Sequence, residues 1–317
     1  MDHKSQTVHR TSSWHRVRDR LFETLSSKRN LALLTVLPAL TLFALINIVP
    51  ILWAIYAGFH DIFIFDPEWT WYGLENYRIL WSDQQFHTSI IRSTTFAIGT
   101  VAFQATAGIL IAVLVAREFR FNRFARAMVM MGYLIPTAIV AYMAYWMGNS
   151  TYGVVNWILL NLGLIDGMIA WFGDSTYAMI SVIGVNWWKY TAFVVIMALA
   201  RLQSIPDSHY EAARVSGASA WRQFRDITLP NLKGVIFIVL LLRGVWMFLH
   251  FDSVWILTRG GPGDSTMVSA VYAYETAFIG YDLGLTAAMS TVLFGILVVA
   301  AIIYFIVLEP EEEVRVE

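Results

Sequence analysis

Long apolar runs separated by polar stretches make up most of the chain. Six runs are long enough to cross a bilayer as helices, which takes about 20 apolar residues. They are 31–57, 89–116, 124–147, 177–201, 234–257 and 284–308. Three prolines, Pro38, Pro50 and Pro136, fall inside runs, where neighbouring helices can satisfy the carbonyl groups that a proline frees. The pattern predicts an all-α polytopic membrane protein with six transmembrane helices.

The composition supports a membrane protein. Hydrophobic residues make up 57% of the 317 residues and charged residues only 14%, whereas soluble domains are about 25% charged. The first run, 31–57, is too long for the apolar segment of a signal peptide, and no small-residue cleavage site follows it. We therefore expect it to remain as the first span. The absence of cysteine excludes disulfides, thiolate metal sites and a cysteine nucleophile.

Lys and Arg lie mainly in alternate polar stretches. The tail 1–30 has seven of them, the short loop after the second run has four, and the loop 201–233 has five. The loops 58–88 and 258–283 have one each, and 148–176 has none. Since cytoplasmic loops carry the excess of Lys and Arg, we expect both termini and the loop 202–233 to be cytoplasmic, in a cytoplasmic (plasma or inner) membrane.

This orientation divides the chain into functional segments. We expect a basic cytoplasmic tail (1–30), a first transmembrane helix (31–57), an extracytoplasmic loop (58–88), a core with the remaining spans (89–308) and an acidic cytoplasmic tail (309–317). In the first tail, apolar residues recur at helical spacing among basic ones, at Trp14, Val17, Leu21 and Leu25. This indicates an amphipathic helix on the membrane surface; the alternative is a disordered tail that only enforces topology.

Two external segments carry local signals. VVNWILLNLGL (154–164) is too short to span a bilayer, and it lies in a loop without Lys or Arg. We expect an interfacial helix at the external end of the bundle. TRGGPGDST (258–266) is rich in turn-forming glycine and proline. It lacks the strand and helix that flank a phosphate-binding loop, so we exclude phosphate binding there.

Enzyme motifs are absent. The chain has no G-x-x-x-x-G-K-[ST], H-E-x-x-H, C-x-x-C or G-x-S-x-G, and its seven histidines are scattered. We therefore assign no catalytic residue and no metal ligand, and we expect no nucleic-acid partner. The functional class that remains is a transporter, which would take its energy from an ion gradient or from another subunit.

The polar stretch 206–230 has the signals of two short helices joined by a turn. Pro206 suits a helix start, Gly217 can end a helix in the left-handed conformation, and Ser219 can cap a second helix. We expect Leu229-Pro230 to end the second helix and begin the fifth span. Ala212 and Ala213 would permit close approach of another surface. The stretch is therefore either a docking element or an ordinary helical loop.

The same stretch resembles a known family. EAA at 211–213, Gly217 and Ile227-x-Leu229-Pro230 are similar, at their spacing, to the EAA loop of permease subunits of binding-protein-dependent ABC importers. LQSIPDSHYEAARVSGASAWRQFRDITLPNL (202–232), YGVVNWILLNLGL (152–164) and FDSVWILTRGGPGDST (251–266) resemble the carbohydrate-uptake branch, of the maltose and glycerol-phosphate type.

The resemblance implies a type I ABC importer fold, in which translocation and ATP hydrolysis belong to different subunits. The EAA loop would contain a coupling helix that docks on a cytoplasmic ATPase, with Glu211, Ala212, Ala213 and Gly217 in the contact. Ile227, Leu229 and Pro230 would fix its angle to the fifth span. The family's partners would be a second, similar permease, two ATPase copies and an extracytoplasmic solute-binding protein. ATP and Mg would bind the ATPase, and no cofactor would bind this chain.

Polar and aromatic groups in the spans are candidates for the sugar pathway. A charged group in mid-membrane costs about 2.5–3.5 kcal/mol and should face the bundle interior. Sugars bind by stacking on aromatic rings and by hydrogen bonds to their hydroxyls. The candidates in the fourth and fifth spans are Asn186, Trp188, Lys189, Trp246, His250 and Asp252. Alternatively, Arg243 and Asp252 pair between helices, and Trp188 belongs to an aromatic belt at the membrane interface.

Two other functions remain open. An ion-coupled secondary transporter could use Lys189 and Asp252 as its ion site, but it leaves the 211–230 pattern unexplained, and the sequence shows no inverted repeat. A non-transporting membrane-assembly subunit would explain the docking loop but not the ionisable groups within the spans.

Overall fold

The computed structural model describes residues 28–66, 68–117 and 119–308. The chain divides into two units, Met1–Tyr56 and Ala57–Glu317. The predicted helix around residues 14–25 and the acidic tail 309–317 lie outside the described residues.

The first unit is helical throughout its described part. It contains α2 (Lys28–Phe43), the π-helical turn η1 (Ala44–Ile48) and most of α3 (Val49–Ala57). The π turn ends two residues before Pro50, and the N–H of Val49 donates to the carbonyl of Ala44. A proline ring clashes with the carbonyl four residues before it, so a widened turn keeps the helix continuous. The apolar segment Thr35–Ala57 is long enough to span a membrane.

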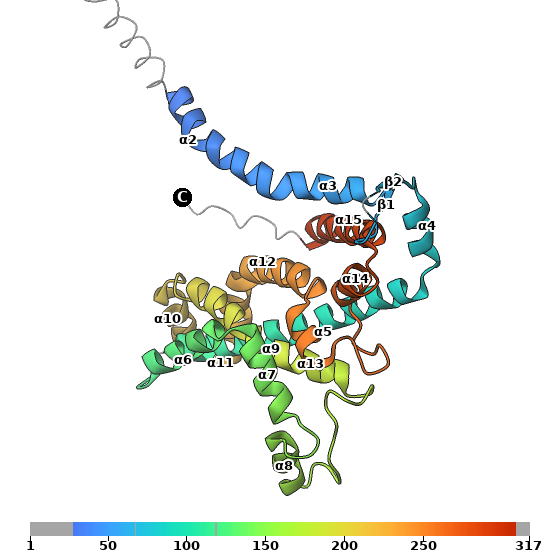
Figure 1. Ribbon diagram of the computed structural model, residues 1–317. Helices are drawn as coiled ribbons and strands as arrows, with labels where there is room; N and C mark the ends of the chain where they lie inside the picture. Colours follow the sequence, from blue (N-terminus) through green and yellow to red (C-terminus); the bar gives the residue numbers. More distant parts are fainter. Residues whose placement is uncertain (1–27, 67, 118, 309–317) are drawn as a thin grey trace, which may run out of the picture. The chain divides into compact units, whose positions relative to one another are not determined.

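The second unit is an assembly of helices with one two-stranded sheet among its described residues (Figure 1). Strands β1 (His60–Asp61) and β2 (Thr70–Trp71) pair antiparallel. The helices that follow are α4 (Glu75–Ser82), α5 (Gln84–Ala116), α6 (Asn122–Leu134), α7 (Thr137–Met147), α8 (Val154–Asn161), α9 (Ala178–Leu202), α10 (Asp207–Val215), α11 (Ala220–Gln223), the π turn η2 (Phe224–Thr228), α12 (Leu229–Phe248), α13 (Asp252–Thr258), α14 (Ser269–Phe278) and α15 (Leu283–Leu308).

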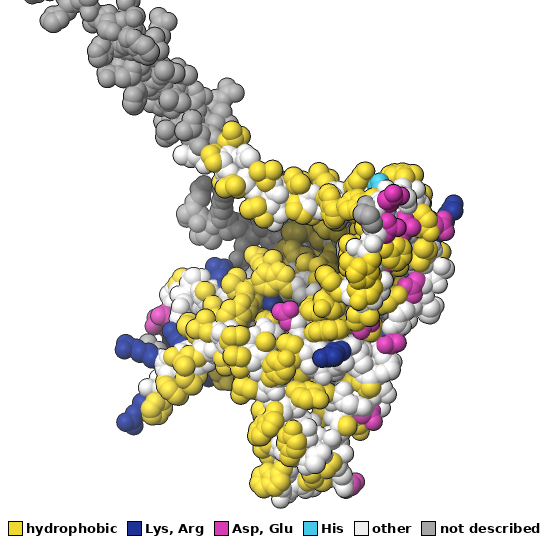
Figure 2. All heavy atoms as spheres, viewed as in Figure 1, with side chains coloured by type: hydrophobic (Ala, Val, Ile, Leu, Met, Phe, Trp, Pro, Cys, Tyr) yellow, Lys and Arg dark blue, Asp and Glu magenta, His cyan; other side chains and the backbone are white. Residues whose placement is uncertain are grey.

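Helix α9 lies at the centre of this unit. It packs against α5, α6, α7, α12 and α13, and 56% of its most apolar window is buried, against 6% for α15. Gly108 allows α5 to pack closely on α9, because a Cβ at Gly108 would lie 2.5 Å from the Cβ of Val194. Hydrophobic side chains cover much of the viewed face (Figure 2), as expected for helices that face lipid.

The predicted span 124–147 is interrupted in the structure, which corrects the sequence-based expectation of a single run. Helices α6 and α7 meet at 95°. The break falls at Ile135 and Pro136. Proline disfavours helical backbone in the residue before it, and Ile135 is extended, with ψ 128°. Among the described residues, five helices can each span a membrane, and the bent pair makes a sixth span if it is counted as one.

The predicted span 234–257 is also divided. Helix α12 ends at Phe248 and α13 begins at Asp252, with His250 in the non-helical break between them. His250 therefore does not continue the helical face of Arg243 and Trp246, although in an unbroken helix its spacing of seven residues from Arg243 would place it there.

The start of α5 is fixed to α14 by side-chain hydrogen bonds. One oxygen of Asp83 caps α5 by accepting the N–H groups of Gln85 and Phe86 at 2.8 and 3.1 Å. The other accepts the Tyr272 hydroxyl at 2.5 Å. Burial and this hydrogen bond raise the pKa of the Tyr272 hydroxyl above its usual range, so Tyr272 remains a donor to Asp83 throughout the physiological pH range.

The predicted short helix in 154–164 is present as α8, and one asparagine holds the surrounding loop. Asn156 is fully buried. Its amide donates to the carbonyls of Asn149 and Ile169 at 3.3 and 2.9 Å. Its carbonyl oxygen accepts the N–H of Ile169 at 3.2 Å and the indole N–H of Trp171 at 3.0 Å. This one side chain therefore joins the segment before α8 to the segment after it.

Replacing Asn156 with alanine should loosen the whole loop around α8. The substitution leaves buried partners unsatisfied, at a cost of about 1–3 kcal/mol each. Hydrogen exchange of the Ile169 amide should accelerate by about tenfold or more, since 1.4 kcal/mol is a factor of ten. The matched control is Asn161→Ala, because the exposed Asn161 amide donates to the Trp157 carbonyl of its own helix. Equal exchange in the two variants would contradict this role of Asn156.

Candidate functional site

The stretch 207–230 forms two helical segments joined by a tight turn. Helix α10 begins after Pro206, which occupies the N-cap position with φ −61°. At its end Gly217 has φ +74°. The N–H of Gly217 donates to the carbonyl of Arg214 at 3.0 Å, and that of Ala218 to the carbonyl of Ala213 at 2.9 Å. This pair of bonds is a Schellman motif, in which a left-handed glycine ends the helix.

The second segment begins at a side-chain cap. The Ser219 hydroxyl accepts the N–H of Arg222 at 3.3 Å, as the sequence predicted. The helix then continues without interruption through α11, η2 and α12 to Phe248. The expectation that Leu229-Pro230 ends it is wrong. As before Pro50, a π turn ends two residues before Pro230, and the N–H of Leu229 donates to the carbonyl of Phe224. The wider turn accommodates the proline ring.

The turn and its flanks present a small apolar surface. Glu211, Ala212 and Gly217 are exposed, and Ala213 is half-buried. Val215 is 91% exposed and Trp221 69% exposed. Such exposure of large apolar side chains at one turn is typical of a surface that binds a protein.

The base of this hairpin is attached to the core. The Tyr210 hydroxyl lies 3.0 Å from that of Thr228, and Arg201 donates to the backbone and side-chain oxygens of Asn231 at 3.0 and 3.2 Å. Ile227 packs, half-buried, against an apolar cluster that includes Leu232. Leu229 and Pro230 lie at the π turn, 37% exposed and half-buried respectively. A force on the hairpin would therefore reach α9 and α12 together.

A buried polar network crosses the middle of the second unit. The Arg243 guanidinium donates to the side-chain oxygen of Gln104 at 2.9 Å, and the Gln104 amide donates to the Asn186 backbone carbonyl at 3.2 Å. The Ser253 hydroxyl donates to the Asn186 side chain at 2.9 Å and lies 2.8 Å from His250 Nε2. All five residues are buried. The network thus connects α5, α9, α12 and the α12–α13 break.

Aromatic rings surround the cationic end of this network. The Arg243 guanidinium lies 4.3 Å from the ring centre of Tyr190, 5.7 Å from that of Trp246 and 5.8 Å from that of Phe193. Cation–π attraction is strongest where charges are desolvated. The charge is therefore held by the Gln104 amide, the Met247 sulfur at 3.5 Å and three rings, rather than by Asp252, which is exposed at the start of α13.

Lys189 stabilises the break between α6 and α7. Its ammonium group is buried and donates to the carbonyls of Gly132, Tyr133 and Ile135. The last carbonyls of a helix have no intrahelical partner, and a cation near them is favourable. The lysine of one span therefore satisfies the carbonyls that Pro136 leaves free in another.

Lys189→Met should destabilise the detergent-solubilised protein. The variant leaves carbonyl groups at the α6–α7 break without a donor, at about 1–3 kcal/mol for each buried group. The expected result is a clear fall in Tm by thermal denaturation. Lys233→Met removes a charge from an exposed position on α12 and should leave Tm nearly unchanged. Equal Tm values for the two variants would contradict the structural role of Lys189.

The structure separates the predicted pathway residues into two groups. Asn186, Lys189 and His250 are buried and hydrogen-bonded. Trp188, Trp246 and Asp252 are exposed on the surface of the second unit. Sequence reasoning missed Gln104, which joins Asn186 to Arg243, and Ser253, which joins Asn186 to His250. The signal for Gln104 was an amide within an apolar run; Ser253 had no signal beyond its place three residues after His250.

The comparisons identify the family of the chain. The model of the binding-protein-dependent transport system inner membrane component family matches residues 104–309. The chain belongs to this family of ABC importer permeases, and the predicted resemblance is confirmed.

Among solved structures, a bacterial ABC transporter involved in import of the acidic polysaccharide alginate matches with a TM-score of 0.76 at 23% identity, covering 90% of this chain and 96% of that one. The methionine transporter MetNI matches with a TM-score of 0.53 at 17% identity, covering 73% and 96%. These likenesses confirm the type I importer fold.

Sequence relatives place the chain among sugar ABC transporter permeases. It is 32% identical over 274 residues to the trehalose/maltose transport system permease protein MalF of Thermococcus litoralis, covering 86% of this chain and 92% of that protein. It is 30% identical over 286 residues to the sulfoquinovosyl glycerol transport system permease protein SmoG of Agrobacterium fabrum, covering 90% and 92%. The chain is therefore a multi-pass membrane permease of this transporter family.

Proposed function

We propose that this chain translocates a sugar or sugar-like solute by alternating access, driven by ATP hydrolysis in a separate subunit. The observation that carries the proposal is the exposed hairpin 207–230 on a chain of the ABC permease family. We propose that Glu211, Ala212, Ala213 and Gly217 contact the ATPase, and that Ile227, Leu229 and Pro230 transmit its movement to α12.

The geometry of the hairpin supports this coupling. Its turn offers small and exposed groups for close approach, and Val215 and Trp221 add apolar area for binding. Its base is fixed by Arg201 to Asn231 and by Tyr210 to Thr228. An element that is exposed at its tip and anchored at its base can act as a lever on two spans.

The six pathway candidates have different roles in this proposal. Asn186 and His250 hold the buried network, and Lys189 holds the α6–α7 break, so they position the helices that line the pathway. Trp188, Trp246 and Asp252 offer two aromatic faces and an acceptor for sugar hydroxyls on the exposed surface of the unit. Trp246 is held in place by edge contact with Phe193, with ring centres 5.7 Å apart.

The proposed assembly has a second, similar permease, two ATPase copies that bind ATP and Mg, and an extracytoplasmic solute-binding protein. It lies in the cytoplasmic membrane with both termini of this chain in the cytoplasm. Two observations support these partners and this placement. The similar alginate transporter was solved in complex with a substrate-bound periplasmic protein, and the basic side chains of α6 and the hairpin loop suit a cytoplasmic side.

Affinity purification of the tagged chain from its membrane tests the proposal. The expected partners are an ATPase with a P-loop, a related permease and a solute-binding protein. Recovery of the chain without an ATPase, together with sugar uptake driven by a proton or sodium gradient, would support the secondary transporter instead. Recovery in an assembly that moves no solute would support the structural role.

A further inference from the structure

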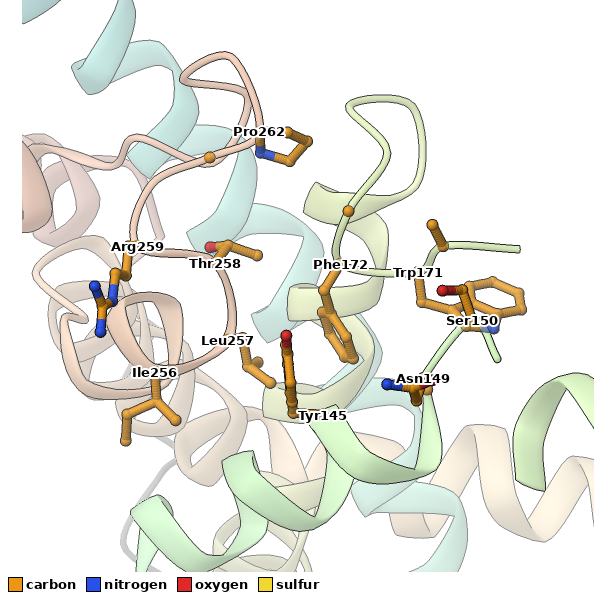
Figure 3. Close-up of a pocket in the computed structure, with 14 residues that line it drawn as sticks. Tyr145, Asn149, Ser150, Trp171, Phe172, Ile256, Leu257, Thr258, Arg259 and Pro262 are labelled. Atoms are coloured by element: carbon orange, nitrogen blue, oxygen red, sulfur yellow. The ribbon is translucent and has the colours of Figure 1, made fainter. Parts of the chain in front are cut away.

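A cavity of about 510 Å³ lies between the end of α7, the segment that follows α8 and the segment 256–262 (Figure 3). This size is within the range of about 300–1,000 Å³ that is usual for small-molecule sites. The sugar-pathway candidates in α9 and α12 do not line it. The lining residues that matter for a ligand are Tyr145, Asn149, Ser150, Trp171, Phe172 and Arg259.

Aromatic rings form one wall of this cavity, which we call the outer cavity. The rings of Tyr145 and Phe172 are stacked, with centres 5.9 Å apart and planes inclined by 26°. Figure 3 shows both rings between α7 and the 256–262 segment, with Trp171 beside Ser150. The pyranose ring of a sugar presents C–H groups that pack on such aromatic faces, so this wall suits a carbohydrate.

The polar groups of the outer cavity are mostly uncharged. Hydroxyl groups come from Tyr145 and Ser150, and an amide N–H from Asn149, whose side-chain oxygen already accepts the N–H groups of Thr151 and Tyr152. The Thr258 hydroxyl, also at the cavity, already bonds to the Val254 carbonyl and the Thr266 hydroxyl. Among the residues that the structure describes, no acidic side chain lines the cavity, and the one basic residue, Arg259, has its guanidinium 5.8 Å from the ring centre of Trp255. In Figure 3 this guanidinium points away from Phe172. Aromatic faces with neutral hydrogen-bonding groups favour a neutral ligand with many hydroxyls over an anionic one.

The aromatic wall is held in place by buried contacts. The Trp171 indole N–H donates to the buried side chain of Asn156 at 3.0 Å, which fixes the ring orientation. Phe172 lies directly on Gly148, since a Cβ at that glycine would come within 2.8 Å of the phenyl ring. A site whose aromatic groups are already fixed loses little conformational entropy when it binds a ligand.

We propose that the outer cavity is a carbohydrate subsite, separate from the candidates in the spans, where a neutral sugar rests on Tyr145 and Phe172 as it enters the permease. This proposal depends on the proposed function, because it assigns one step of the sugar's path. A sugar released from a binding protein would meet this cavity before it reaches Trp188, Trp246 and Asp252.

The absence of cysteine permits a direct test by single-cysteine labelling. Ser150→Cys introduces the only thiol of the chain at the exposed edge of the outer cavity, and Ser82→Cys places one at an exposed position at the end of α4. The assembled transporter in detergent, without its solute-binding protein, is labelled with a methanethiosulfonate reagent. The probes are trehalose, maltose and an acidic uronate disaccharide.

Trehalose or maltose should slow labelling of Ser150→Cys about threefold when it is present at twice its Kd, because the reagent reacts with the unoccupied fraction. Neither sugar should slow labelling of Ser82→Cys, and the uronate disaccharide should not protect either thiol. Equal labelling of Ser150→Cys with and without both neutral sugars would overturn the subsite. Protection by the uronate as strong as that by the neutral sugars would overturn its preference for neutral ligands.

Uptake kinetics give a second readout that separates this proposal from the proposed function. Tyr145→Ala should raise the KM for sugar about three- to tenfold, since one aromatic contact contributes about that factor. Tyr142→Ala, at a 64% exposed position of the same helix outside the cavity, is the matched control. ATP-driven uptake with the same KM in all three proteins would overturn the subsite alone. Absence of ATP-driven sugar uptake in the wild type would overturn the proposed function.

Discussion

Gly217→Val is expected to abolish most ATP-driven uptake while the chain still inserts into the membrane. At φ +74° a side chain with a Cβ costs about 1–2 kcal/mol, and the two bonds that end α10 would be strained. The valine side chain would also project from the turn, because a Cβ there meets no atom of the described residues within 4 Å. If the valine side chain weakens docking of the hairpin on the ATPase by about 1.4 kcal/mol, ATPase association falls tenfold. Uptake and co-purification of the ATPase measure the two effects.

Gly163→Val is the matched control for this experiment. Gly163 ends α8 in the same motif, with φ +66°, and a Cβ there would also have no atom of the described residues within 4 Å. Its N–H donates to the carbonyl of Leu160, and that of Leu164 to the carbonyl of Leu159. The backbone penalty should therefore be similar, but the site lies outside the hairpin. Equal loss of ATPase association in both variants would show that Gly217 has no special role in docking.

Gln104→Leu is expected to lower the stability of the protein strongly. The variant removes the side-chain oxygen that accepts from the buried Arg243 guanidinium at 2.9 Å. Removing one partner of a hydrogen bond to a charged group costs about 1.5–3 kcal/mol, and the three rings and the Met247 sulfur that remain beside Arg243 offer no comparable acceptor. Thermal denaturation of the detergent-solubilised transporter should show a markedly lower Tm.

Two comparisons make this prediction specific. Gln104→Glu keeps an acceptor for Arg243 and should retain more stability than Gln104→Leu. Gln203→Leu changes an exposed glutamine at the end of α9 and should have a small effect on Tm. If Gln104→Leu and Gln203→Leu have the same Tm, Arg243 does not depend on Gln104.

The hairpin could be predicted from sequence because its signals are local. Each signal acts on backbone groups within a few residues of itself. Helices begin after Pro206 and Ser219, and one ends before Gly217, as the sequence predicted. The exception is Pro230. Proline usually breaks a helix, and the sequence gives no sign that a π turn would accommodate it.

The polar interior could be predicted only in part. Intramembrane Lys189 and Arg243 had to face protein because exposure to lipid is costly, and both are buried. Their partners depend on which helices pack together, which no local pattern determines. Lys189 thus binds carbonyls far away in the chain, 56 residues in the case of Tyr133. The break at His250 was likewise hidden, because neither glycine nor proline lies in it.

Sugar uptake into proteoliposomes tests the central claim most directly. Vesicles would contain this chain, its partner permease and the ATPase, with the solute-binding protein and labelled sugar on the outer side of the permease. We predict uptake that requires ATP on the ATPase side and that Gly217→Val mostly abolishes. Uptake by this chain alone, driven by a proton or sodium gradient without ATP, would contradict the account.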